Sequence, residues 1–194
     1  MNKLPQIFLS IIFAFCFFPA VAKENKALYT GGMLILQPGH LTGNNHLYSF
    51  EANTHGVGGI FRFYFLKYGT IGIYGGTQQG NYPTKNSSDS FLQIGYGGPF
   101  IGLSFQKNKF RYTFSSFVGK GTLKNLHIDK QTGTQLEQAH YVKQGITIFS
   151  PIASMDYALS KRLYLTLQTV YLLSYYEESK LHNPIVQIGL LFHR

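Results

Sequence analysis

The sequence predicts an all-β fold: an eight-stranded antiparallel up-and-down transmembrane β-barrel that follows a cleaved signal peptide. Three observations predict it. The chain begins with an apolar segment that has the form of an export signal, apolar and polar residues then alternate along most of its length, and short and long connections follow one another in turn. No segment after the export signal has the period of an amphipathic helix.

The first 22 residues have the form of a secretory signal peptide. Lys3 gives a basic start, residues 7–18 are an almost unbroken apolar run, and Ala20-Val21-Ala22 offers the small-residue pattern that a signal peptidase reads. The run is roughly a dozen residues, shorter than the ~20 that a membrane-spanning helix needs. We therefore expect cleavage near Ala22, with residues 1–22 as the signal peptide and 23–194 as the barrel.

Composition excludes several classes of protein. The single cysteine, Cys16, lies in the expected signal peptide, so disulfides, thiol nucleophiles and cysteine metal sites are excluded from the exported chain. The formal charge is +9, but the basic residues are scattered rather than gathered on one element, so we expect no nucleic-acid binding. The 17 Phe and 14 Tyr residues are typical of strands with aromatic belts.

Alternation with a period of two residues is clearest in segments 57–65, 110–119 and 162–175. In the first segment, Phe61 and Phe63 point to one side and Arg62 to the other. The same reading along the chain gives eight strands, at 27–37, 54–66, 70–79, 91–105, 110–121, 140–159, 162–176 and 184–194.

The connections between these strands indicate where the barrel resides. Three are very short, around Lys67-Tyr68-Gly69, Lys107-Asn108-Lys109 and Ser160-Lys161. The other four are longer and alternate strictly with the short ones, at 38–53, 80–90, 122–139 and 177–183. Tight periplasmic turns and longer external loops are the layout of barrels in the bacterial outer membrane, where we expect this protein.

Mid-strand charges should face the lumen, because Lys or Arg on the lipid face near the midplane costs about 2–4 kcal/mol. Alternation places Arg62, Arg111 and Lys143 on the lumen side, and Asp156 joins them if Pro151 marks a register shift. Buried charges in so narrow an interior should pair or form hydrogen bonds. We therefore expect a lumen network formed by Arg62, Tyr64, Arg111, Lys143, Asp156 and Arg162.

A second irregularity is expected in the glycine-rich stretch Gly95-Tyr-Gly-Gly98, where the outward parity changes between Tyr96 and Ile101. No helix follows these glycines, so they do not form a phosphate-binding loop. They predict a β-bulge or strand bend.

The chain resembles small eight-stranded outer-membrane barrels, and more specifically uncharacterised outer-membrane proteins of Bacteroidota. The stretches that carry the resemblance are Gly31-Gly32, Gly58 to Gly72, Ser150-Pro151 to Leu165, and the ending Gly189 to Arg194. A terminal strand with the aromatic Phe192 near its end looks like the signal read by the barrel assembly machinery, although His193 and Arg194 follow it. The resemblance implies fold and location, and it assigns no catalytic residue.

Ser116, His140 and Glu137 are the candidates for a catalytic constellation. Ser116 interrupts an apolar face, and His140 has the same outward parity on the neighbouring strand. A nucleophile needs its base within about 3 Å. The expected pairing puts His140 about two residue pairs above Ser116 on the neighbouring strand, which is too far for this contact. We therefore prefer to interpret His140 as a histidine at the rim of the barrel and Ser116 as a small residue of its outer surface.

Histidines offer no metal site by their spacing. Most of them lie in expected loops, and neither a His-x-His pair nor a helical pair occurs. We expect no metal and no cofactor. The histidines concerned are His40, His46, His55, His127, His140 and His182.

These observations lead to three functional hypotheses. The first is a non-enzymatic barrel with a structural role in the envelope or with loops that contact partners. The alternatives are a lipid A-modifying enzyme of the deacylase or acyltransferase type, and a small pore. The expected partners are outer-membrane lipids, lipopolysaccharide and the barrel assembly machinery, and we expect a monomer.

Overall fold

The structure is a computed structural model, which describes residues 29–44, 49–65, 68–84, 87–132, 135–176 and 179–193. The expected signal peptide with its cleavage site, and His46, lie outside these residues. Within the described part there is no helix long and apolar enough to cross a membrane.

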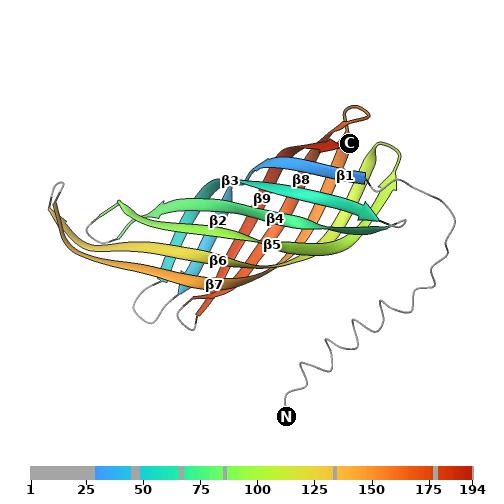
Figure 1. Ribbon diagram of the computed structural model, residues 1–194. Helices are drawn as coiled ribbons and strands as arrows, with labels where there is room; N and C mark the ends of the chain where they lie inside the picture. Colours follow the sequence, from blue (N-terminus) through green and yellow to red (C-terminus); the bar gives the residue numbers. More distant parts are fainter. Residues whose placement is uncertain are drawn as a thin grey trace, which may run out of the picture.

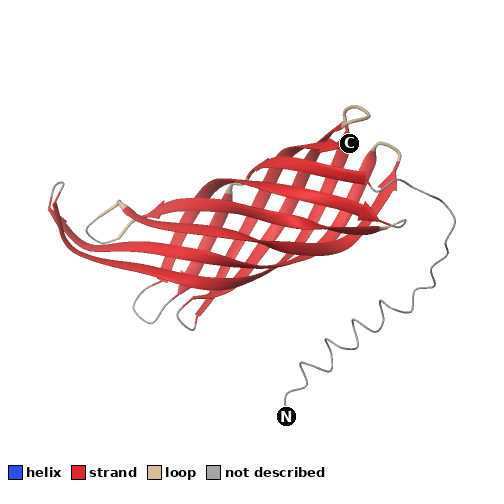
Figure 2. Ribbon diagram, viewed as in Figure 1, coloured by secondary structure: helices blue, strands red, loops and turns tan. Residues whose placement is uncertain are grey.

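The described elements are all β-strands (Figure 2). In chain order they are β1 (Tyr29–Leu36), β2 (Gly39–Asn44), β3 (Ser49–Phe65), β4 (Gly69–Tyr82), β5 (Ser90–Lys107), β6 (Phe110–Thr132), β7 (Gln135–Ala158), β8 (Leu163–Tyr176) and β9 (Ser179–His193).

Antiparallel pairing closes these strands into a barrel (Figure 1). From β3 to β9 each strand pairs with the next along the chain. The barrel closes because β1 and β2 both pair with β3 on one side and with β9 on the other. β1 and β2 therefore occupy one position in the wall, and the nine strands form an eight-stranded up-and-down barrel, which confirms the predicted fold class.

The break between β1 and β2 falls at Gln37-Pro38, because proline has no N–H to donate to a ladder. The remaining backbone groups keep their partners across the break. The Gln37 N–H donates to the carbonyl of Gly56 at 3.1 Å, and the Pro38 carbonyl accepts the Val186 N–H at 3.1 Å. The predicted loop 38–53 is therefore mostly strand.

The predicted loop 122–139 is also mostly strand, because β6 and β7 continue well beyond the barrel wall as a long hairpin (Figure 1). Pairing of β7 with β8 starts only at Ile148, so the outer part of β7 pairs with β6 alone. From residue 135 to residue 141 both faces of β7 are exposed, and alternation of apolar and polar residues is then not required. This is why the sequence pattern resembles a loop.

The two predicted irregularities are absent from the register. Tyr96 is only 7% exposed and points inward like its even-numbered neighbours in β5, so the chain keeps its parity through Gly95–Gly98. β7 likewise passes Pro151 in unbroken register with β6. The shifts between β6 and β7 lie farther out, around Lys130.

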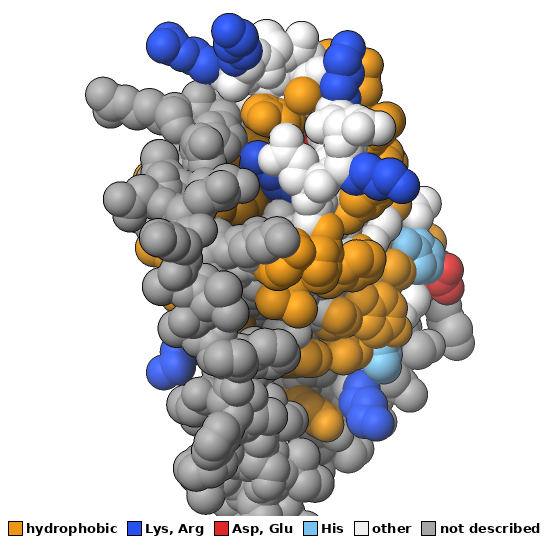
Figure 3. Space-filling model, turned by 90° about the vertical axis from the view of Figure 1, so that its right-hand side faces the viewer, with side chains coloured by type: hydrophobic (Ala, Val, Ile, Leu, Met, Phe, Trp, Pro, Cys, Tyr) orange, Lys and Arg blue, Asp and Glu red, His pale blue; other side chains and the backbone are white. Residues whose placement is uncertain are grey.

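Large apolar side chains cover the outer surface of the wall. In β6, Phe114 is 60% and Val118 51% exposed, and β1, β3, β4, β5, β8 and β9 carry similar outward residues. Figure 3 shows one face, on which a hydrophobic area is bordered by Lys and Arg side chains above and below.

The interior contains two kinds of side chain. Toward the end where β6 and β7 extend, the inward residues are mainly aliphatic and pack into one cluster. Toward the short turns they are mainly polar or charged. Among the aliphatic group are Leu41, Leu92, Ile94, Leu123, Ile146, Ile148, Leu172 and Leu181.

Substituting Gly72 should destabilise the barrel, because a Cβ there would lie 2.0 Å from the carbonyl oxygen of Phe61 and 2.7 Å from the Phe100 ring. We expect Gly72→Ala to lower the free energy of unfolding by about 1–3 kcal/mol, the usual range for overpacking. The matched control is Gly145→Ala, whose added Cβ would meet no atom within 4 Å. Urea titrations followed by circular dichroism measure both, and equal midpoints would contradict the packing shown here.

Candidate functional site

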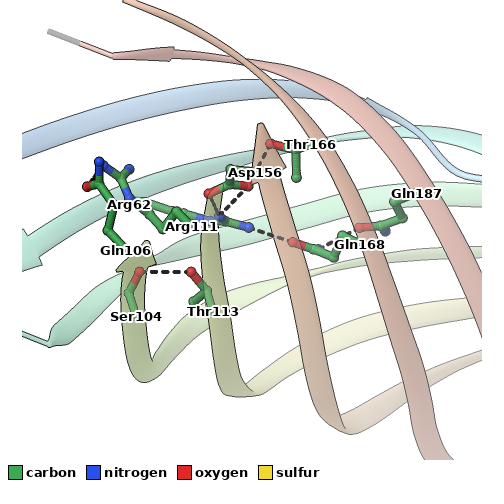
Figure 4. A network of polar contacts seen from close by, with 9 residues as sticks. All are labelled: Arg62, Ser104, Gln106, Arg111, Thr113, Asp156, Thr166, Gln168 and Gln187. Carbon is green, nitrogen blue, oxygen red and sulfur yellow. Dashed lines mark hydrogen bonds and ion pairs between the residues drawn. The ribbon is translucent and has the colours of Figure 1, made fainter. Parts of the chain in front are cut away.

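An ion pair between β3 and β7 lies at the centre of the polar part of the lumen (Figure 4). The Arg62 Nη1 atom is 3.2 Å from the Asp156 Oδ2 atom, and the two side chains are 1% and 0% exposed. Charges removed from water this completely stay in place only when they are paired and hydrogen-bonded. Each of the two therefore depends on the other.

Two neighbouring side chains on β8 complete the ion pair. Thr166 donates its hydroxyl proton to the Asp156 Oδ1 atom at 2.8 Å. Arg62 donates from Nη2 to the Gln168 Oε1 atom at 2.6 Å. The carboxylate and the guanidinium are thus both held by side chains of one strand, β8, which is the neighbour of β7 (Figure 4).

A chain of neutral hydrogen bonds continues from Gln168 across the lumen. Gln168 donates to Gln187 at 2.6 Å, and Gln187 donates in turn to the Gln37 Oε1 atom at 2.8 Å and to the Tyr74 hydroxyl at 2.5 Å. The Tyr74 and Tyr96 hydroxyls are 2.7 Å apart, and Tyr96 donates to the Gln37 Oε1 atom at 3.0 Å. The network therefore connects β4, β5, β9 and the break between β1 and β2 to the ion pair.

Gln37 also ties the break in the first wall position to the strands beside it. Its amide donates to the backbone carbonyls of Val57 and Thr77, at 3.0 and 2.8 Å. Its own carbonyl accepts a hydrogen bond from the Gln78 amide at 3.0 Å. Side chains thus replace the ladder bonds that end at Pro38.

Arg111 lies nearer the short turns and is bound differently. Its guanidinium carbon is 4.3 Å from the centroid of the Tyr64 ring and 5.1 Å from that of Tyr164, a cation–π arrangement. It also donates to Gln106 at 3.3 Å (Figure 4). A buried cation between two aromatic rings fills this end of the lumen.

Two residues predicted for the lumen lie elsewhere. Lys143 is exposed, opposite Lys124 on the outer side of β7. It has the parity of the outward residues, because β7 keeps one register and Asp156 needs no shift to face inward. Arg162 is exposed in the segment between β7 and β8. Both lie beyond the apolar surface of the wall, where a cationic side chain can reach water without pointing into the lumen.

The sequence interpretation missed Gln37, Gln78 and Gln187, which are at most 2% exposed. A signal for Gln187 was present, because it stands between the outward residues Val186 and Ile188 in the last strand. Gln37 and Gln78 lie at the ends of predicted strands, where a polar residue is equally typical of a loop.

The structure does not bring the catalytic candidates together. Ser116 is exposed and pairs with Pro151, whereas His140 pairs with His127, eleven positions farther along β6. That separation is about 36 Å at a strand rise of ~3.3 Å per residue. Glu137 lies farther out still. The hydrogen bond from Lys130, and to a smaller extent the one from Thr132, holds the pKa of its carboxyl below the usual value.

Histidines cluster on the outer hairpin. The Nε2 atoms of His127 and His140 lie 3.6 and 3.2 Å from the two carboxylate oxygens of Asp129. No group of three or more residues suited to a metal ion occurs within the described ranges. The predicted loop position of His127 was wrong, since it lies in β6, whereas His140 lies in β7, within the strand predicted at 140–159.

A depression of about 410 Å³ opens beside β2 and the outer end of β3. On its wall His40 contacts the Glu51 carboxylate at 3.0 Å and Asn53 at 2.9 Å. The lining residues are His40, Phe50, Glu51, Asn53, Tyr82 and Pro83. Ser116, His140 and Glu137 are not among the residues that line it.

No protein-family model matches the sequence, and no curated protein sequence matches it significantly. Solved structures do match. Neisserial surface protein A superposes with a TM-score of 0.56 at 8% identity, over 83% of this chain and 96% of that one. Outer membrane protein OprG from Pseudomonas aeruginosa gives 0.55 at 10% identity, over 86% and 94%. Ail, the attachment invasion locus protein of Yersinia pestis, solved with the heparin analogue sucrose octasulfate, gives 0.50 at 15% identity, over 86% and 100%.

These comparisons establish the fold. The chain has the architecture of the small outer-membrane β-barrels and spans nearly the whole length of each of the three. At such low identity no site residue is carried over from them. The resemblance to proteins of Bacteroidota stays a prediction.

Breaking the ion pair on one side should cost more than removing both charges. We expect Arg62→Met and Asp156→Leu to lower the free energy of unfolding by about 3–5 kcal/mol each, because each leaves one buried charge without its partner. The double variant should lose much less than the sum, since neither charge remains.

Urea titrations of the three variants in one detergent measure this double-mutant cycle. Lys161→Met, which removes an exposed charge between β7 and β8, is the control and should have little effect. Strictly additive losses for Arg62→Met and Asp156→Leu would contradict the coupling.

Proposed function

We propose that the protein is a monomeric, non-enzymatic barrel of the bacterial outer membrane that anchors and presents its long β6–β7 hairpin outside the cell. The apolar outer band of the wall is the observation that carries this proposal. In β6 the outward residues from Phe110 to Val118 include four large hydrophobic ones, each at least 36% exposed. Water would solvate so continuous an apolar surface poorly, whereas lipid chains match it.

The height of this band supports the same proposal. Eight steps of about 3.3 Å from Phe110 to Val118, tilted by ~40°, rise about 20 Å between Cα atoms, close to the ~25 Å band of outer-membrane barrels. Aromatic pairs gather at the short-turn end, with ring centroids 5.2 Å apart for Tyr68–Phe105 and 5.0 Å apart for Phe110–Tyr157. Such residues favour the membrane–water interface.

The interior argues for an anchor over a pore. The Arg62–Asp156 network crosses the polar part of the lumen, and the aliphatic cluster fills the part nearer the hairpin. An ion would have to displace both.

The hairpin is the part best suited to contact a partner. From Gln135 to Tyr141 every side chain of β7 is exposed, including the hydrophobic Leu136 at 55% and Tyr141 at 57%. The outer edge of this part of β7 has no neighbouring strand among the described residues. Backbone groups along such an edge can pair with an extended segment of another chain.

The orientation can be tested with single cysteines, because Cys16 lies in the expected signal peptide. We expect Lys130→Cys, on the outer hairpin, to react with a membrane-impermeant maleimide in intact cells. The matched control Lys161→Cys, between β7 and β8, should react only after the outer membrane is permeabilised. Labelling in the reverse order would overturn the orientation, and recovery of the protein in the soluble periplasmic fraction would overturn the membrane location.

Planar-bilayer recordings test the closed interior. The inserted protein should give no conductance steps, because the lumen is filled by side chains on both sides of the Arg62–Asp156 pair. As a control, the unheated protein should migrate faster on a gel than the boiled protein, which verifies that the sample is a folded barrel. Steps that persist in such a sample would favour the pore.

A further inference from the structure

Three lysines share the outer face of β6 and β7 just beyond the apolar band. Lys124 and Lys143 are direct partners in the antiparallel register, and Lys120 lies four residues before Lys124 on the same face. Side chains directly opposite each other have Cβ atoms about 4.5–5.5 Å apart, so the two lysine side chains leave the sheet at neighbouring points. Like charges in such a pair destabilise a sheet.

No carboxylate compensates these lysines within the described part of the chain. Glu137 is bound to Lys130, Asp129 to the hairpin histidines, and Asp156 to Arg62. The two others are bound at other sites, Glu51 to His40 and Asp89 to Gln131. Their cross-strand neighbours are neutral as well: Gln93 for Lys124, and Gly97 and Thr147 for Lys120.

The surface between the lysines is almost bare of side chains. Thr122 lies between Lys120 and Lys124 on β6, and its partners on the two adjacent strands are Gly95 and Gly145. A Cβ added at Gly145 would meet no atom within 4 Å. The three lysines therefore border a part of the surface on which Thr122 is the one side chain between two glycines.

The apolar band begins directly beyond Lys120. Val118 and Phe149 are partners in the next outward pair below Lys120, and they are 51% and 48% exposed. A molecule with a phosphate among the lysines would have its hydrocarbon chains on this surface. An amphiphile with an anionic head satisfies both conditions, whereas a soluble anion satisfies only the first.

We propose that Lys120, Lys124 and Lys143 form a binding site for the phosphate groups of an anionic lipid of the outer leaflet. This inference rests on the proposed insertion in the membrane, because the chains of the lipid must lie against the wall. Lys120 is about 13 Å along the strand from Lys124, at ~3.3 Å per residue, which gives two points of positive charge. A bound phosphate removes the repulsion between Lys124 and Lys143.

Retention of lipid by the protein tests the site. The full chain, processed by the cell and purified from membranes, is placed in nanodiscs of phosphatidylcholine that contain a minor fraction of either lipid A or phosphatidylglycerol. Native mass spectrometry after release in detergent then gives the ratio of anionic to zwitterionic lipid retained. The two arms identify the source of the phosphate.

The variant carries Lys120→Gln, Lys124→Gln and Lys143→Gln together. Its matched control carries Lys107→Gln, Lys109→Gln and Lys161→Gln, which remove the same charge at the short turns. We expect the wild type and the control to retain the anionic lipid. In the variant the ratio of anionic to zwitterionic lipid retained should fall by at least about five-fold, since each lysine near an anionic surface contributes on the order of that factor. Equal retention by the variant and the control, in both arms, would overturn the site.

Stability in pure phosphatidylcholine separates binding from a structural role. There Lys143→Gln should leave the thermal midpoint unchanged or raise it, because it removes repulsion from Lys124. A clear fall would assign these lysines to the fold and overturn the inference. If the wild type fails to insert into phosphatidylcholine at all, the proposed function itself is wrong, and the two failures are thus distinguishable.

Discussion

Closure of the sheet by β9 is the constraint on which the rest of the structure depends. An open eight-stranded sheet would leave a row of N–H and C=O groups unpaired at each edge, a cost that an apolar environment makes prohibitive. Pairing of β9 with both β1 and β2 removes those edges from the wall. It does so in spite of Pro38, because Gln37 and Gln78 bond the backbone around the break.

Closure also decides what the interior can contain. Eight strands enclose a space that side chains alone fill, so every inward residue contacts others. The Arg62 and Asp156 side chains, which reach inward from different parts of the wall, are therefore held against each other. Gln168 binds the guanidinium and Thr166 the carboxylate. Beyond Ile148 of β7 the sheet is no longer closed, and the hairpin continues with an open edge along β7, where residues 135–141 are exposed on both faces.

The alternation of apolar and polar residues allowed the strands of the wall to be predicted from the sequence, and with them some of the side chains that face the lumen. Arg62 and Arg111 could be placed inside from sequence because each interrupts a long run of outward aromatics, and only one parity avoids lipid. Lys143 was misplaced because β7 was read without its partner. Only the register shows that it lies opposite Lys124, beyond the apolar surface, where either parity is permitted. The hydrogen bonds of Gln37 and Gln187 could not be predicted, since they join residues far apart in sequence.

The register also explains why the unpaired charges lie on the outside of the barrel and not in its lumen. The three buried charges of the lumen, Arg62, Asp156 and Arg111, each have a partner in the chain. On the outer face of β6 and β7 three charges have none among the described residues, and two of them repel each other. A molecule that neutralises these lysines removes the repulsion between Lys124 and Lys143. Their place at the border of the apolar band limits that molecule to one that is anionic at one end and apolar at the other.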